Sequence, residues 1–400
     1  MEQLVGCLGR LEQLAQLVGA SARPSLLVLQ PTPYCNLDCS YCYLRHRDDR
    51  SRMSDETLRA VARNILAPLP PGARPTIVWH GGEPMTLPPG WYRDAFALLQ
   101  RESGDARLDH AFQTNAVAVT EAWIDLWRDW AVSVGVSLDG PADLHDARRR
   151  TRAGTGSHAL TMRGIARLQR AGLPFHVITV LSAESLTRPD DLYDFYASHG
   201  LRNVAFNVEE EEGQPGGSSL RPGADTPRAY RAFLDRFQDR AEADPLPMRC
   251  REIEGVHDLL ARPHPDRARN GQVRPLDIVS IAADGGMSTF SPELLGMRAP
   301  HYNDFIFGNV REGGPETMLG HPAFRRAAAE IARGVAACAA ECAYFEVCGG
   351  GAPANKYFEL GSFEGTETLY CRLTRQETLE SVLSAMEARR PDRPAARALP

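Results

Sequence analysis

The stretch SLLVLQPTPYCNLDCSYCYL (residues 25–44) indicates both a fold and a chemistry. It opens with an apolar run typical of a buried strand, and Cys35, Cys39 and Cys42 follow in C-x3-C-x2-C spacing. Three thiolates on one tight loop can hold three irons of a 4Fe–4S cubane, which leaves the fourth iron open to a small molecule. Structural zinc is the main alternative. Zinc usually takes four ligands, and His46 is the only close candidate for a fourth.

This strand is the first of a regular series of strands and helices. Strands alternating with amphipathic helices imply right-handed βαβ units and a parallel sheet. Six repeats are too few for an eight-fold barrel, so we expect an α/β fold, a partial (β/α)6 TIM-type barrel with its active site at the carboxyl ends of the strands. The further strands are expected at Thr76–Trp79, Leu108–Gln113, Val132–Leu138, Phe175–Leu181 and Asn203–Val208, and the helices at about 54–66, 90–103, 120–130, 159–171 and 188–199.

The chain of 400 residues is long enough for two domains. We expect an N-terminal helix at 1–24, the barrel at 25–225, a bridging region with a β-hairpin at 226–330, a cysteine-rich domain at 331–388 and a disordered tail at 389–400. The bridging region should hold helices near 226–243 and 250–262, and a further helix near 322–335 should lead into the cysteines.

Composition excludes several classes of protein. The net charge of −6 argues against nucleic-acid binding, which needs a basic surface. No apolar run reaches 18 residues, and the first residues lack the pattern of a secretory signal, so we expect a cytoplasmic protein without a membrane span. The nine cysteines are an odd number in such a chain, which argues against a disulfide framework.

A second cysteine group lies near the C-terminus. Cys338, Cys342, Cys348 and Cys371 supply four sulfurs, a complete ligand set for a 4Fe–4S cluster or for zinc. A cluster with four cysteine ligands has no open iron, so electron transfer is favoured over substrate ligation. The isolated Cys7 is expected to be inert, as is Cys250.

Polar residues follow several of the expected strands. Because the carboxyl ends of parallel strands share one edge, these residues can line one pocket. Ordinary turn and capping chemistry is the alternative, and a run of acids is usually a solvated face. The segments are Gly81-Gly82-Glu83-Pro84, Gln113-Thr114-Asn115, Ser137-Leu138-Asp139 and Glu209-Glu210-Glu211-Glu212.

The first cysteine group, with Tyr41 before its last cysteine, resembles the signature of radical S-adenosylmethionine (radical SAM) enzymes over about residues 25–375. The resemblance implies that the open iron binds the amino and carboxylate groups of SAM. An electron from the cluster then cleaves SAM to methionine and a 5′-deoxyadenosyl radical, which abstracts a substrate hydrogen. It further implies a cofactor site formed by Tyr41, Gly81, Gly82, Glu83, Pro84, Asn115, Ser137, Asp139 and Arg149.

The second cysteine group resembles the SPASM domain of peptide and protein maturases. Full SPASM domains hold two auxiliary clusters. Here the hairpin segment Ser288–Pro292 and the segment Gly308–Gly314 lack a cysteine, and Ala352 replaces another. The lost positions all belong to one cluster, so the resemblance implies one auxiliary 4Fe–4S cluster on Cys338, Cys342, Cys348 and Cys371, with zinc as the alternative.

Longer matches resemble the GrrM/OscB group of cyclophane-forming maturases. They cover Gln30–Leu44, Trp79–Pro84, Phe206–Gly213 and Ser291–Gly296. The implied reaction joins a side-chain Cβ of a ribosomally synthesised precursor peptide to an aromatic ring. Glu209 or Glu210 would take the proton and the auxiliary cluster the electron, with flavodoxin or ferredoxin as electron donor.

Other functions remain open from the sequence. Enzymes with the same architecture catalyse epimerisation, thioether formation or the hydroxyl and thiol oxidation of sulfatase maturation. A protein that binds zinc or an iron–sulfur cluster only for structure would use the same cysteines without catalysis.

Overall fold

The computed structural model describes residues 24–211, 217–223, 225–263 and 267–389. The expected N-terminal helix lies outside these residues except for Pro24, and the expected tail lies outside them except for Arg389.

A parallel sheet organises the chain. Strands β1 (Leu26–Leu29), β2 (Thr76–Trp79), β3 (Asp109–Thr114), β4 (Ser133–Ser137), β5 (His176–Leu181) and β6 (Asn203–Val208) lie side by side in chain order. Each pairs in parallel with the next. The partial α/β barrel expected from the sequence is therefore confirmed, and all six strands end on the same side of the sheet.

Helices return the chain between the strands. Ser54 begins α2 by accepting a hydrogen bond from Thr57 N at 3.1 Å, and the aromatic side chains of β2, β3, α3 and α4 pack into a buried layer around Trp79 and Phe112. The short helix α5 was not expected from the sequence. The helices are α2 (Asp55–Val61, continued by a π-helical turn at Ala62–Leu66), α3 (Pro89–Glu102), α4 (Glu121–Asp129), α5 (Ala142–Arg148), α6 (His158–Arg170) and α7 (Pro189–Ser198).

The chain beyond β6 adds strands to both edges of the same sheet. The hairpin formed by β8 (Ile278–Ile281) and β9 (Gly286–Thr289) lies next to β1, because β8 pairs with β1 in parallel. Strand β10 (Gly308–Asn309) pairs with β9, and β7 (Arg249–Cys250) pairs with β6 at the other edge. The expected hairpin therefore exists, and it extends the barrel sheet.

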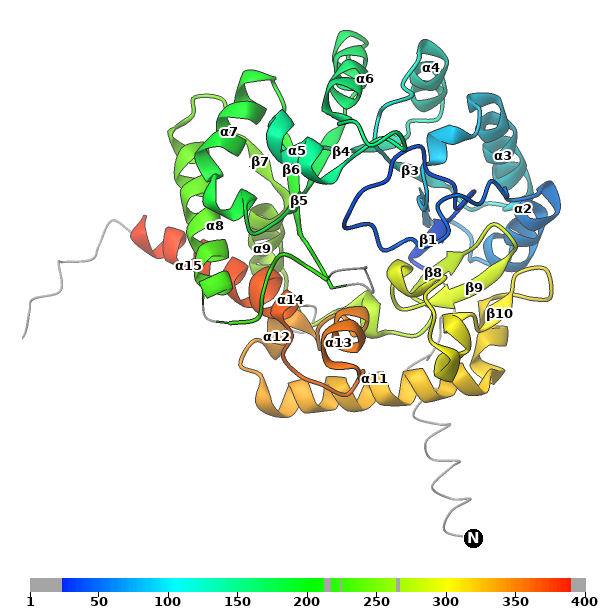
Figure 1. Cartoon of the computed structure of the whole chain (residues 1–400). Helices are drawn as coiled ribbons and strands as arrows, with labels where there is room; N and C mark the ends of the chain where they lie inside the picture. The colour runs from blue at the N-terminus through cyan, green and yellow to red at the C-terminus, as the bar shows by residue number, and fades with distance from the viewer. Residues whose placement is uncertain (1–23, 212–216, 224, 264–266, 390–400) are drawn as a thin grey trace, which may run out of the picture.

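The C-terminal helices lie across the open side of this sheet (Figure 1). Helix α11 (Pro322–Glu341) runs along one side, followed by α12 (Phe345–Cys348), α13 (Pro353–Leu360) and α14 (Leu369–Cys371). After a π-helical turn at Arg372–Glu377, α15 (Thr378–Ala388) packs on α8 (Asp225–Ala243), where Gln238 Nε2 donates to Ser381 Oγ at 2.7 Å, and on α9 (Arg251–Ala261). Short 3-10 turns occupy Pro84–Thr86, Ser185–Thr187, Gly271–Val273, Pro292–Leu294, Pro300–Phe305 and Pro315–Gly320.

None of the helices that the structure describes has the length and apolar character needed to cross a membrane.

Candidate active site

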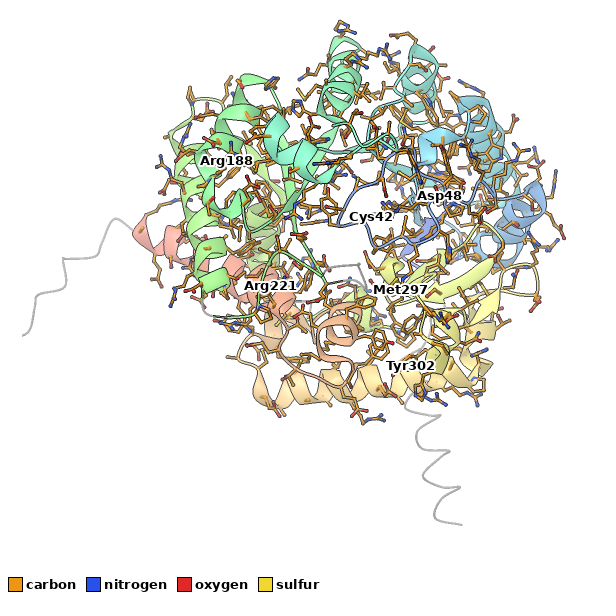
Figure 2. All side chains as sticks on the ribbon, viewed as in Figure 1. Cys42, Asp48, Arg188, Arg221, Met297 and Tyr302 are labelled. Carbon is orange, nitrogen blue, oxygen red and sulfur yellow. The ribbon has the colours of Figure 1, made fainter. Side chains whose placement is uncertain are left out.

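Cys35, Cys39 and Cys42 lie on the loop that follows β1, and Figure 2 shows Cys42 near the middle of the ring of strands and helices. The last residue of α5 and the segment after it form backbone hydrogen bonds with this loop. Asp38 N donates to Arg150 O at 2.7 Å, and Ser40 N donates to Arg148 O at 2.9 Å. Arg152 adds a hydrogen bond from Nε to Cys35 O at 2.9 Å. These contacts place the thiols at the carboxyl end of the sheet.

A pocket of about 340 Å³ opens beside these thiols. It lies where the loops after β1, β2, β3, β4 and β6 meet, so residues far apart in the sequence share it. Of the residues expected at the site, Gly81, Pro84 and Asp139 do not line it. Those that do are Cys35, Cys39, Tyr41, Cys42, Gly82, Glu83, Asn115, Ser137, Arg149, Glu209 and Glu210.

Glu83 is a buried acceptor held in one orientation. Its Oε1 accepts from Thr114 Oγ1 at 2.7 Å and from Met85 N at 3.0 Å, and its Oε2 accepts from Asn115 N at 2.8 Å. Burial raises the pKa of Glu83, and these hydrogen bonds only partly oppose that rise. The carboxyl group therefore meets a ligand in a preset position.

The glycines before Glu83 allow the turn to pack against the cysteine loop. Gly82 has φ +58°, and a Cβ there would lie 2.4 Å from Tyr34 O. Glu83 N donates to the same Tyr34 O at 2.8 Å. A side chain at Gly82 would therefore push the turn away from the segment that leads into Cys35.

Asp139 lies behind the pocket and holds two residues that line it. It accepts from Arg149 Nε at 2.9 Å and from Tyr41 Oη at 2.7 Å. Burial alone would raise the pKa of Asp139, but Arg149 and His145 hold it below its usual range. Burial likewise opposes the charge of Arg149, but Asp139 and Tyr41 outweigh it and raise the pKa of that guanidinium. Asp139 thus positions Arg149 at the pocket wall.

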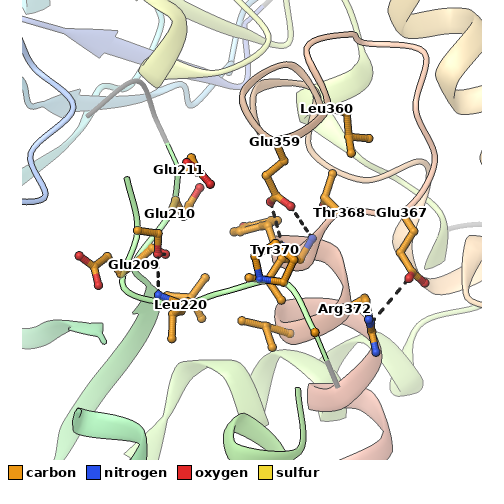
Figure 3. A pocket seen from close by; sticks show the side chains of 16 residues that line it. Glu209, Glu210, Glu211, Leu220, Glu359, Leu360, Glu367, Thr368, Tyr370 and Arg372 are labelled. Atoms are coloured by element: carbon orange, nitrogen blue, oxygen red, sulfur yellow. Dashed lines mark hydrogen bonds and ion pairs between the residues drawn. The ribbon is translucent and has the colours of Figure 1, made fainter. Parts of the chain in front are cut away.

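The two glutamates expected to act on the substrate have different surroundings. Glu209 Oε1 accepts from Arg148 Nη1 at 3.2 Å, and Oε2 accepts from Ser219 N at 3.1 Å and from the Ser219 hydroxyl. Glu210 Oε2 accepts from Asn355 Nδ2 on α13. Glu210 also lines two neighbouring pockets, and Figure 3 shows one of them, with Glu209, Glu210 and Glu211 along one side. The fourth acid of this run, Glu212, lies outside the described residues.

The thiols of the first group suit metal ligation. Burial raises the pKa of Cys35 to about 12 and that of Cys39 to about 11. Free thiols with such values are poor nucleophiles at neutral pH. A coordinated metal ion would deprotonate these thiols outright.

The second group surrounds a separate pocket of about 250 Å³. Cys338 and Cys342 come from the end of α11, Cys348 from the end of α12 and Cys371 from α14. Gly351 N donates to Cys348 Sγ at 3.2 Å, and Lys356 Nζ donates to Cys338 Sγ at 3.3 Å. Hydrogen bonds to sulfur are among the interactions that set the reduction potential of an iron–sulfur cluster.

The sulfurs of each group line a pocket without converging on one point. Within the described ranges, no three His, Cys, Asp or Glu side chains could hold a single metal ion. Four thiolates on one tetrahedral zinc, with Zn–S distances of about 2.3 Å, would lie about 3.8 Å apart. A 4Fe–4S cubane instead gives each thiolate its own iron, so its ligands need not share one metal ion.

Four residues of the site were missed in the sequence. Arg152 anchors the cysteine loop, and Asn36 Oδ1 accepts from Asn115 Nδ2 at 2.7 Å. His145 Nδ1 accepts from Asp139 N at 3.3 Å, and Lys356 contacts Cys338. The basic run Arg148–Arg152 was a signal for Arg152, and the occurrence of a single lysine in the chain was a signal for Lys356.

Comparison with known proteins identifies the family. Residues 29–196 match the Radical SAM superfamily, a range that holds the three cysteines, Glu83, Asp139 and Arg149. The uncharacterized protein sll1766 of Synechocystis sp. is 42% identical over 369 residues, which cover 91% of this chain and 92% of that protein. This chain belongs to the radical SAM superfamily. The radical SAM enzyme uses S-adenosylmethionine and a 4Fe–4S cluster, and the donors that line the pocket fit both.

Two further proteins resemble the radical SAM enzyme. The serine-type anaerobic sulfatase-maturating enzyme of Klebsiella aerogenes is 31% identical over 204 residues, so the match spans about half of each chain, 50% of this one and 49% of the relative. The solved structure of anSMEcpe with bound AdoMet and the Cp18Cys peptide superimposes with a TM-score of 0.70 and 17% identity, covering 91% of this chain and 98% of that one. The second similarity shows a shared fold.

Proposed function

We propose that this radical SAM enzyme crosslinks a ribosomally synthesised precursor peptide, joining a side-chain Cβ to an aromatic ring as the GrrM/OscB group does. The reaction needs a site for hydrogen abstraction, a proton acceptor and an electron acceptor within reach of one substrate. One observation carries the proposal. The pocket beside Cys35 shares Asn207, Val208 and Glu210 with a cleft of about 660 Å³ that reaches Cys348 of the second cysteine group.

Cofactor binding is assigned to the residues of the first pocket. Cys35, Cys39 and Cys42 would hold three irons, Glu83 would accept from the amino group of SAM, and Arg149 would donate to its carboxylate. Ser137, whose Oγ accepts from Gln113 Nε2 at 2.9 Å, would face the ribose. Bound together, the cluster and SAM supply a carbon-centred radical that abstracts hydrogen. The protein orients the cofactor and excludes water.

A peptide fits the larger cleft. The cleft runs from the end of β6 past α9 to α12, and its lining includes Arg251, Arg262, Arg269 and Arg375. A ligand extended along it would contact the SAM pocket at one end and the auxiliary site at the other. The solved structure of anSMEcpe holds a bound peptide together with AdoMet, which supports a peptide substrate here.

Glu210 is the better placed of the two glutamates to accept the proton. Ring attack leaves the aromatic carbon with one proton and one electron to lose before aromaticity returns. Glu209 accepts from Arg148 and Ser219 and does not line the larger cleft, so we assign Glu209 a positioning role. Glu210 accepts from Asn355 and does line that cleft. Glu210 lines the SAM pocket, the cleft and the acidic pocket of Figure 3, where it would meet a substrate.

We assign an auxiliary 4Fe–4S cluster as the acceptor of the electron that the ring loses. Its ligands would be Cys338, Cys342, Cys348 and Cys371. The protein reconstituted under anaerobic conditions should contain about eight irons per chain, four in each cubane. Replacing Cys338 and Cys342 by Ala should leave about four irons and retain SAM cleavage while crosslinking is lost. Unchanged iron in that variant would overturn the assignment.

The test of the reaction is co-expression with the short open reading frame beside the gene. Mass spectrometry should show a peptide that has lost two hydrogens and resists fragmentation inside a ring. The Glu210→Gln variant should still cleave SAM while forming much less crosslinked peptide, and Glu312→Gln, a change of an exposed glutamate, should match the wild type. An unchanged mass with an inverted residue would show epimerisation and overturn the proposal.

Sulfatase-type oxidation of a hydroxyl or thiol is the second candidate, and the 31% identity to a serine-type sulfatase-maturating enzyme favours it. Oxidation of a hydroxyl also removes two hydrogens, whereas oxidation of a thiol removes two hydrogens before hydrolysis replaces the sulfur by oxygen and releases hydrogen sulfide. Either product is linear and fragments normally. A linear oxidised peptide would therefore select this candidate over the crosslink.

A further inference from the structure

Lys356 is the only lysine of the chain, and every other residue among its 45 lysines and arginines is an arginine. It lies on α13 and is 2% exposed. A buried ammonium group is normally paired with a carboxylate. Within the described residues Lys356 forms no ion pair, and its Nζ donates to Gly334 O at 3.2 Å and to Cys338 Sγ at 3.3 Å. The sulfur is therefore the natural counter-charge of this ammonium group.

The surrounding backbone fixes the lysine in this position. A Cβ at Gly351 would lie 3.4 Å from Lys356 Cε, so the aliphatic stem passes close beneath the glycine loop that follows Cys348. Gly334 and Cys338 lie one helical turn apart on α11, so both acceptors of the ammonium group come from one rigid helix. The neighbouring Asn355 donates from Nδ2 to Glu210 Oε2 and so links α13 to the end of β6.

The other donors to the cysteine sulfurs are uncharged. Gly351 N donates to Cys348 Sγ at 3.2 Å, and Gln376 Nε2 lies 3.9 Å from Cys371 Sγ. Lys356 is thus the single charged donor to these sulfurs in the part of the chain that the structure describes. A lysine ammonium is a compact point charge that can approach one sulfur, whereas a guanidinium presents a planar fork that needs more room.

We propose that Lys356 sets the reduction potential of the auxiliary cluster by compensating the charge of the Cys338 thiolate. This inference rests on the proposed function, in which the four cysteines hold a cluster that accepts an electron. Net charge and hydrogen bonds to sulfur set the potentials of such clusters. A fixed positive charge stabilises the more negative, reduced state more than the oxidised state. Lys356 therefore raises the potential and favours electron acceptance from the substrate.

The experiment uses the full chain with Cys35, Cys39 and Cys42 replaced by Ala, so that only the auxiliary cluster is loaded. Iron content and the midpoint potential, from an anaerobic redox titration followed by electron paramagnetic resonance, are measured for Lys356→Met, Lys356→Gln and Lys356→Arg. Met and Gln should keep about four irons per chain and shift the potential to more negative values. The Lys356→Arg variant keeps the positive charge, so its midpoint potential should lie closer to that of the parent protein.

Gln376→Met is the matched control, because it removes an uncharged donor from Cys371, and its potential should change less than that of Lys356→Met. If Lys356→Met loses iron, the midpoint potential of Lys356→Gln, which retains a hydrogen-bond donor, tests the proposal instead. A cluster-loaded Met or Gln variant with the parent potential would overturn the role of Lys356 and leave the crosslinking reaction untouched. Zinc in place of iron in the parent would overturn the auxiliary-cluster assignment and the inference with it.

Discussion

A buried ion pair stands behind the cofactor pocket. Arg149 and Asp139 are both nearly inaccessible to solvent, and removing one partner of such a pair leaves the other charge buried without compensation. Asp139 also accepts from Tyr41 Oη, so two residues of the pocket wall, Tyr41 and Arg149, depend on one carboxylate.

Replacing Asp139 by Asn should weaken SAM binding about tenfold, because Arg149 would lose its counter-charge and its fixed direction. Breaking the buried pair should also lower the free energy of unfolding by roughly 3 kcal/mol. Equilibrium dialysis of reconstituted protein with labelled SAM measures the effect. Asp143→Asn is the control, since that carboxylate lies on α5, pairs with Arg188 and is 59% exposed. Equal SAM affinity in the two variants would contradict the role of Asp139.

His110 makes stability depend on pH. It is buried, stacks on Phe96 with ring centroids 4.0 Å apart, and its Nδ1 accepts from Trp79 Nε1 at 3.2 Å. Burial lowers the pKa of His110 from 6.5 to about 4. Below about pH 6.5 this histidine is protonated in the unfolded chain but stays neutral in the folded chain. The free energy of unfolding therefore has its full value above that pH and decreases as the pH falls toward 4.

Between pH 7.5 and 5.5 this histidine should remove about 1 kcal/mol from the free energy of unfolding. Urea denaturation of anaerobically prepared protein at both pH values measures the loss. In His110→Phe the decrease in the free energy of unfolding between these pH values should be about 1 kcal/mol smaller than in the wild type. The variant should be less stable at both pH values, because Trp79 Nε1 loses its acceptor. His257→Gln, at an exposed position of α9, should behave as the wild type, and the same pH dependence in all three proteins would contradict the prediction.

At the scale of elements, the loops after β1 and β2 depend on each other. A Cβ at Gly82 would meet the backbone carbonyl oxygens of Thr32, Pro33 and Tyr34, so no flexible side chain there can move aside to relieve the clash. The position of the three cysteines is therefore coupled to a segment about 40 residues further along the chain.

Gly82→Ala should displace the cysteine loop and lower the iron content from about eight to about four per chain, with the auxiliary cluster retained. Iron analysis and the loss of SAM cleavage measure this result. Gly90→Ala is the control, because a Cβ at that position of α3 meets no atom within 4 Å. Full iron content in Gly82→Ala would show that the turn tolerates a side chain.

At the scale of the whole molecule, the barrel and the C-terminal part share one sheet. Strand β1 pairs with β2 on one side and with β8, about 250 residues later, on the other. The boundary at residue 225 therefore remains a hypothesis about domains, because cutting the chain there would leave β1 as an exposed edge.

A fragment of residues 24–225 should accordingly be insoluble, since the apolar β1 would lose its neighbour β8. Co-expression with residues 226–389 should restore soluble protein, because β8 could then pair in trans. Soluble yield and far-ultraviolet circular dichroism measure both outcomes. A soluble, folded and monomeric fragment would instead establish the barrel as an independent domain.

The sequence by itself determined the series of elements and the two cysteine groups. Strands β2 and β6 have the bounds that their apolar runs predicted, and the sulfur ligands are recognisable because their spacing lies within short segments. Local periodicity and local spacing are properties of neighbouring residues, so they are visible without a fold.

Tertiary structure alone decided which polar side chains face the pocket and which stand behind it. Asp139 supports Arg149, Glu209 is bound by Arg148 and Ser219, and Lys356 meets Cys338. Each of these contacts joins side chains whose direction depends on the packing of separate elements. The pairing of β8 with β1 also depends on the closure of the whole chain, for which no short segment carries a signal.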